Sequence, residues 1–89
     1  MDATKNWTVT IEISEHDGHT RAVAKLHTGK NDEIAGLGFA RLNPVDKDVP
    51  DIGDEIAAAR ALSDLSRRLL GTATDDIEQN SGAPAHLVM

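Results

Sequence analysis

Between Trp7 and Ile13 the chain alternates strictly between apolar and polar side chains, and this period of two residues is its most constraining feature. Trp7, Val9, Ile11 and Ile13 fall on one side of an extended backbone. The residues between them are polar, namely Thr8, Thr10 and Glu12. Because successive side chains of a strand point to opposite faces, the pattern predicts a half-buried β-strand.

A second strand is predicted over residues 20–27, after turn residues that include Gly18, which is free to adopt a positive φ. Ala22, Ala24 and Leu26 share one face of this strand. The other face carries Arg21, Val23, Lys25 and His27. Two successive strands joined by a short turn are expected to pair in antiparallel fashion.

A third strand is predicted over residues 33–42, and it is apolar on both faces. Ala35, Leu37 and Phe39 point one way, whereas the other face carries Ile34, Gly36, Gly38, Ala40 and Leu42. Glycines inside a strand indicate a bulge or the close approach of another backbone. A strand covered on both sides is typical of a subunit interface. We therefore expect a homodimer whose interface includes Gly36, Leu37, Gly38 and Phe39.

A long helix is predicted after a loop that Asn43 and Pro44 open, with Asp51 as its N-cap and residues 52–70 as its body. Its apolar stripe is Ala58, Leu62, Leu65 and Leu69, and its opposite side carries Arg60, Asp64, Arg67 and Arg68. Gly71 is expected to end this helix. Residues 74–79 are expected to form a second, short helix.

The expected order of elements is β-β-β-α-α. It predicts an α+β two-layer sandwich, in which the long helix packs on one face of a three-stranded antiparallel sheet. The 89 residues allow one domain, residues 1–89, with an ordered core of about 6–79 and a tail at 80–89. A domain of this size buries limited surface, so dimerisation is a natural supplement to its stability.

Several classes of function are disfavoured by what the sequence lacks. It has no cysteine, which excludes disulfides, thiolate zinc sites and cysteine nucleophiles. No apolar run is long enough for a membrane span or a signal peptide, so we expect a cytoplasmic protein. The serines lack a nucleophile elbow, and Gly36 and Gly38 do not form a phosphate loop. We expect no enzymatic activity, no catalytic residue, no cofactor and no small-molecule substrate.

Two histidines, His16 and His19, are spaced like some metal-ligand pairs, with Glu15 and Asp17 beside them. Metal ligation needs two or three preorganised ligands and partners that orient them. Because these residues lie in a predicted turn without an evident third ligand, we interpret them as solvated, and no metal site is predicted.

Basic residues form two groups, although the net charge of −6 opposes non-specific attraction to nucleic acid. Arg21 and Lys25 share a face of the second strand with His27. The predicted helix carries the second group, Arg60, Arg67 and Arg68. Either group could bind phosphate or simply face solvent. For the helix, Asp64 lies four residues from Arg60 and from Arg68, which is the spacing of exposed ion pairs.

Several stretches of the chain resemble a family of small actinobacterial proteins of unknown function. They are residues 15–22 (EHDGHTRA), 36–44 (GLGFARLNP), 52–65 (IGDEIAAARALSDL) and 75–78 (DDIE). The resemblance extends from about Trp7 to Leu87. It implies a fold like that of the double-stranded-RNA-binding domain, similar to ribosome hibernation-promoting factors. It also implies a role in dormancy or hypoxia for some members, and dimerisation for at least some.

The resemblance and the basic groups together predict a dimeric, non-catalytic protein of the stress or dormancy response that binds the ribosome or structured RNA. The chain contains no basic motif that matches the RNA-binding residues of better-known relatives, so none of those residues is carried over. The candidate phosphate contacts are therefore taken from the two basic groups, and they are Arg21, Lys25, Arg60, Arg67 and Arg68. The alternative is a protein-interaction module without a nucleic-acid role. The acidic charge, the doubly apolar third strand and the apolar tail favour that alternative.

Overall fold

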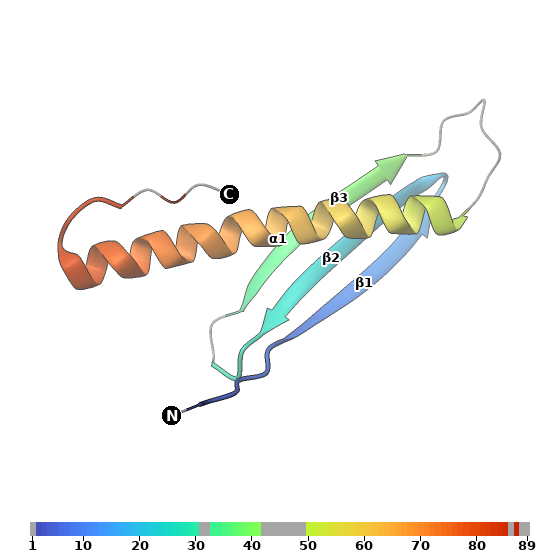
Figure 1. Ribbon diagram of the computed structural model, residues 1–89. Coiled ribbons are helices and arrows are strands. Elements are labelled where there is room, and N and C mark those ends of the chain that lie inside the picture. The colour runs from blue at the N-terminus through green and yellow to red at the C-terminus, as the bar shows by residue number, and fades with distance from the viewer. Residues whose placement is uncertain (1, 31–32, 42–49, 86, 88–89) are drawn as a thin grey trace.

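The computed structural model describes residues 2–30, 33–41, 50–85 and 87. It contains three strands, β1 (Thr8–His16), β2 (His19–His27) and β3 (Ile34–Arg41), and one helix, α1 (Pro50–Ser81) (Figure 1). The strands form one antiparallel sheet in the order β1-β2-β3. The predicted α+β class and the three-stranded antiparallel sheet are therefore confirmed, whereas the expected pair of helices is a single helix.

The hairpin between β1 and β2 is closed by a two-residue turn. Asp17 and Gly18 both have positive φ, 49° and 73°, which is the backbone that matches the right-handed twist of paired strands. The positive φ predicted for Gly18 is confirmed. This turn sets His16 opposite His19, and from there it fixes the register along both strands.

A single face of the sheet is covered, because α1 lies across β2 and β3 and touches β1 only slightly (Figure 1). The core between the two layers consists mostly of alanine, with two leucines: Ala22, Ala24, Leu26, Ala40, Ala57, Ala61 and Leu65. The face predicted for Ala22, Ala24 and Leu26 is confirmed. The alanine-rich core indicates that the helix lies very close to the sheet.

Gly36 and Gly38 permit this close approach. A Cβ on Gly36 would lie 2.8 Å from the Cα of Leu65, and one on Gly38 would lie 2.9 Å from the backbone carbonyl carbon of Arg60. The predicted approach of another backbone is confirmed, but that backbone is α1 of the same chain. α1 of the same chain therefore covers these two glycines. The expected dimer interface at Leu37 and Phe39 stays a prediction.

The buried stripe of α1 also differs from the prediction. It consists of Ala57, Ala61 and Leu65, whereas Leu62 is 42% exposed and Leu69 is only partly buried. Backbones that approach this closely leave room only for small side chains where they cross. The helix therefore presents its alanines to the glycines of β3, and Leu62 lies outside the buried stripe.

Both expected ends of the helix are corrected. α1 begins at Pro50, so Asp51 lies in its first turn rather than at the N-cap. The helix continues through Gly71 because a glycine inside a helix costs only about 1 kcal/mol. It ends before Gly82, whose φ is 69° and whose N–H donates to the Glu78 carbonyl oxygen at 2.7 Å. The predicted second helix is thus the last part of α1.

The face of β1 that was predicted to be half-buried is exposed. Val9, Ile11 and Ile13 share the helix side of the sheet with their partners in β2, yet they are 42%, 38% and 43% exposed. The prediction of burial was wrong because α1 does not extend over β1. Trp7, which precedes the strand, is 56% exposed.

Some expectations lie outside the described residues: the strand stop at Asn43 and Pro44, the place of Leu42 on the same face as Ala40, and the loop up to residue 49. Within the described ranges, no helix is both long and apolar enough to cross a membrane.

Candidate nucleic-acid interface

The sheet face that points away from α1 is not covered by any described element, and we call it the open face. The register places three basic side chains on it, Arg21 and Lys25 from β2 and Arg41 from β3. Three histidines lie on the same face, namely His16, His19 and His27. Glu12 is the one acidic residue among its described strand positions. The open face is thus positively charged, although the chain carries a net charge of −6.

Phe39 is at the centre of the basic end of this face. It lies directly opposite Arg21 in the register and is 56% exposed. Arg41 is two residues further along β3, opposite His19, and is also exposed. An exposed aromatic ring flanked by guanidinium groups provides a stacking surface and counter-charges on one flat face. Single-stranded nucleic acids are bound by this combination.

The other group of cations lies along the outer edge of β3. Arg60 donates from Nη1 to the carbonyl oxygen of Phe39 at 2.6 Å, and Asp64 Oδ2 accepts from the N–H of Leu37 at 2.9 Å. Asp64 Oδ2 also accepts from Nε of Arg68 at 3.0 Å, and Arg67 lies 3.7 Å from Asp64 Oδ1. We call Arg60, Asp64, Arg67 and Arg68 the edge cluster. It satisfies backbone groups that an edge strand otherwise leaves unpaired.

The hydrogen bond from the Leu37 N–H is the main reason that the pKa of Asp64 lies below its usual value of 3.8. The hydrogen bond and charge of Arg68 and the charge of Arg67 lower this pKa further, and partial desolvation opposes them. A lowered pKa in the folded state means that ionised Asp64 stabilises the fold above pH 3.8. That contribution is lost as the pH falls through the folded pKa.

We predict that Asp64→Asn lowers the melting temperature at neutral pH, because the amide keeps an acceptor for Leu37 but loses the charge that attracts the arginines. The difference from the wild type should shrink as the pH falls below 3.8. Thermal melts followed by circular dichroism across this range measure it. A difference that is constant with pH would contradict an ionic role for Asp64.

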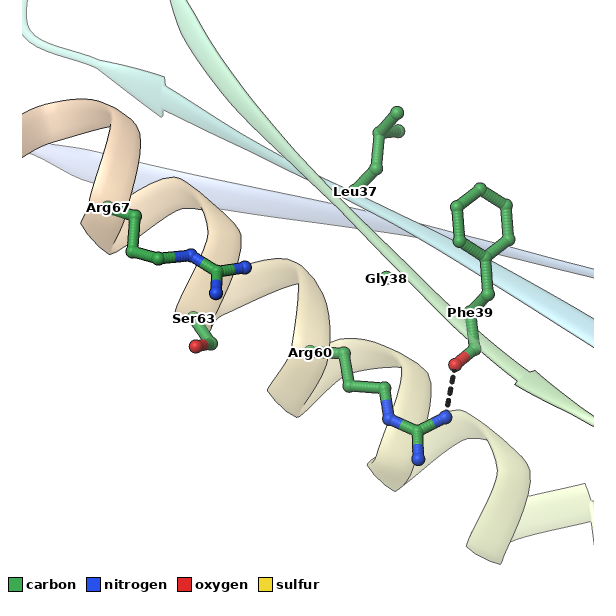
Figure 2. Close-up of a pocket in the computed structure, with 6 residues that line it drawn as sticks. All are labelled: Leu37, Gly38, Phe39, Arg60, Ser63 and Arg67. Carbon is green, nitrogen blue, oxygen red and sulfur yellow. Dashed lines mark hydrogen bonds between the residues drawn. The ribbon is translucent and has the colours of Figure 1, made fainter. Parts of the chain in front are cut away.

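A shallow pocket of about 400 Å³ lies where the edge cluster meets β3 (Figure 2). Its lining includes Arg60, Ser63 and Arg67 from α1 and the strand residues Leu37, Gly38 and Phe39. In Figure 2 the two guanidinium groups reach from the helix toward β3, whereas the side chains of Leu37 and Phe39 point away from the helix. The guanidinium groups of Arg60 and Arg67 and the hydroxyl of Ser63 are donors that can bind an anionic group such as a phosphate in this pocket.

The predicted site residues thus fall on two adjoining surfaces. Arg21 and Lys25 lie on the open face, while Arg60, Arg67 and Arg68 lie along the edge of β3. Phe39 connects the two, because its ring belongs to the open face and its carbonyl oxygen binds Arg60. Of the two predicted ion pairs of Asp64, the one with Arg68 forms, whereas Arg60 binds the strand instead.

Arg41 and the histidines of the open face were not among the candidate residues. The signal for Arg41 was present in the sequence, because it continues the alternation of Ala35, Leu37 and Phe39. Its neighbours from β2 could not be identified without the register. Across the described part of the chain, no cluster of three or more His, Cys, Asp or Glu residues is arranged to hold a metal ion. His16 Nε2 lies 3.1 Å from Asp17 Oδ2, and both side chains are exposed.

The fold and the open face define a small α+β domain, a three-stranded sheet with one helix on one side and a basic surface on the other. The chain belongs to the Rv2632c-like family, whose model matches residues 5–86.

Relatives in two mycobacteria share most of this chain. The uncharacterized protein Mb1767 of Mycobacterium bovis is 52% identical over 84 residues, which cover 94% of this chain and 88% of the relative. The uncharacterized protein Rv2632c of Mycobacterium tuberculosis is 44% identical over 80 residues, or 90% of this chain and 85% of the relative. The crystal structure of Rv2632c superposes with a TM-score of 0.83 at 42% identity, covering 93% of this chain and 98% of that one.

Proposed function

We propose that this protein is a non-catalytic RNA-binding protein and that the open face is its binding surface. The observation that carries the proposal is the position of Phe39, which is exposed and lies directly opposite Arg21. The described strand positions of this face carry three full positive charges and one carboxylate. Bases stack on Phe39 in the proposed complex, and Arg21, Lys25 and Arg41 contact phosphates.

The edge cluster extends this surface around β3. Arg60 and Arg67 line the pocket beside Phe39, so a phosphate that follows a base stacked on Phe39 reaches their guanidinium groups. The charge of Arg68 is paired with the Asp64 carboxylate at 3.0 Å, whereas Arg60 donates to a neutral carbonyl oxygen and Arg67 lies 3.7 Å from Asp64. In the proposed complex Arg60 and Arg67 therefore contribute more to RNA binding than Arg68 does.

The resemblance to hibernation-promoting factors extends the proposal to the target, which is the ribosome of a dormant or stressed actinobacterial cell. The test is co-sedimentation of the purified protein with ribosomes from a mycobacterium through a sucrose cushion, at low and at physiological salt. Pelleting that persists at physiological salt is the expected result, because stacking on Phe39 is less sensitive to salt than phosphate contacts are. Absence of pelleting at both salt concentrations would refute ribosome binding.

Phe39→Ala is expected to weaken the binding of a labelled single-stranded RNA by about 1–3 kcal/mol, which is the usual contribution of one stacked base. Because the ring is 56% exposed, its removal should leave the melting temperature nearly unchanged. Fluorescence anisotropy measures the affinity. Leu37→Ala, on the same face of the same strand, is the matched control and should have a smaller effect. Equal losses in both variants would argue against stacking.

A protein-interaction module is the second candidate, and a different observation favours it. The apolar row of β1 is exposed on the other side of the sheet, at a strand edge that has no partner within the described residues. An interaction there leaves the open face accessible, so the two candidates can be distinguished by which surface a variant disables. RNA-independent association of this protein with a second chain would support the module.

A further inference from the structure

The two edge strands of the sheet differ in whether their outward backbone groups are hydrogen-bonded. At β3 the edge cluster binds the N–H of Leu37 and the carbonyl oxygen of Phe39. At β1, none of the hydrogen bonds between described residues reaches the outer side of the strand. Exposed edge strands are commonly protected by lysine, proline or a bulge. β1 has no lysine, proline or bulge over its nine residues, and of its two carboxylates Glu12 lies on the open face and Glu15 lies next to the turn.

The register identifies the residues whose backbone groups face outward. The odd-numbered residues of β3 point their N–H and C=O groups away from β2, as the contacts of Leu37 and Phe39 with α1 show. Hydrogen-bonded pairs alternate along an antiparallel ladder. In β1 the outward groups therefore belong to Val9, Ile11, Ile13 and Glu15. The first three are also the exposed apolar residues on the helix side of the sheet.

The sequence of β1 is self-complementary about Ile11. If two copies pair in antiparallel fashion around a twofold axis through this residue, Val9 meets Ile13, Thr8 meets Ser14, and Thr10 meets Glu12. Over residues 8–14, apolar residues then pair only with apolar residues. Glu12, the charged residue of the central part of the strand, faces a threonine rather than its own copy. A register centred on Glu12 would oppose two carboxylates, which is unfavourable.

We propose that two copies of this chain pair through β1 in the register centred on Ile11. The product is a six-stranded antiparallel sheet with both helices on one side and both open faces on the other. The outward N–H and C=O groups of Val9, Ile11 and Ile13 bond to the second copy, and the two apolar rows lie side by side between the helices. This interface is separate from Leu37 and Phe39 and does not depend on RNA binding.

The mass in solution tests the interface. Light scattering of the wild type at high micromolar concentration should give twice the 9.5 kDa of the chain. Ile11→Lys should give the single-chain mass, because it places two ammonium groups opposite each other at the axis. Ile77→Lys removes a similarly exposed isoleucine (43% against 38%) from the helix and should remain dimeric. Circular dichroism should show that both variants are folded.

Cysteine substitution tests the register, because the chain has no native thiol. Hydrogen-bonded partners are about 5.5 Å apart between Cα atoms, a distance that a disulfide spans. Ile11→Cys should therefore cross-link to itself on mild oxidation. Val9→Cys alone should not, since its two copies are offset by four residues, which is about 14 Å along the strand at about 3.4 Å per residue. It should cross-link when mixed with Ile13→Cys. A monomeric wild type, a dimer that survives Ile11→Lys, or cross-linking of Val9→Cys to itself would each overturn the proposal.

Discussion

Replacing Gly38 with alanine is expected to destabilise the domain by about 3 kcal/mol or to prevent its folding. The added Cβ would overlap the backbone of α1 at Ala57 and Ala61 and would lie 2.9 Å from the carbonyl carbon of Arg60. These atoms belong to a helix backbone and cannot rotate away. The helix would have to move off the sheet, which would expose the alanine core. Gly36→Ala should behave alike, because its Cβ would meet Ala61 and Leu65.

The matched control is Gly71→Ala, a glycine-to-alanine change within α1. An alanine Cβ at Gly71 meets nothing within 4 Å, so only the backbone preference changes. This variant should be more stable than the wild type by about 1 kcal/mol. In a domain of this size the expected shifts in melting temperature are roughly −12 to −24 °C for Gly38→Ala and +4 to +8 °C for Gly71→Ala. A small shift for Gly38→Ala would contradict direct contact between the backbones of β3 and α1.

The second large effect concerns RNA binding. The double variant Arg21→Glu/Lys25→Glu reverses two of the three positive charges on the open face. If both residues contact phosphate, the salt dependence of binding, expressed as the slope of log K against log salt, should fall by roughly 1.4 to 1.8 in magnitude. The affinity at low salt should fall for every RNA sequence, since phosphate contacts carry no sequence information.

Lys5→Glu/Lys30→Glu is the control for this variant, because it changes the net charge of the chain equally. Lys5 precedes β1, and Lys30 follows β2. The control separates a local effect of the open face from a general effect of charge. Equal weakening in both double variants would mean that only overall charge matters, and no weakening in either would remove the open face from the proposed site. Titration of labelled RNA at several salt concentrations gives both quantities.

Two pairs of basic residues illustrate what sequence patterns can predict about this site. One pair is Arg21 and Lys25 on β2, and the other is Arg60 and Arg67 on α1. Alternation placed the first two on one face of a strand, and the structure retains them there. Helical spacing grouped the second pair with Asp64 as an outward-facing set. Spacing along a helix does not show which strand lies beside it, so the contacts of Arg60 with Phe39 and of Asp64 with Leu37 could not be predicted.

Local chemistry in the sequence determined the three strands, their order, the turn at Gly18, the inward face of β2 and the existence of a long helix. These follow from side-chain periodicity and backbone preference, which act over a few residues. Three features were decided only by the tertiary structure. They are the identity of the buried helix stripe, the continuation of α1 past Gly71, and the exposure of β1, which α1 does not cover. Each of these depends on where one layer lies on the other. The glycines of β3 fix that position, because only there can the two backbones come so close.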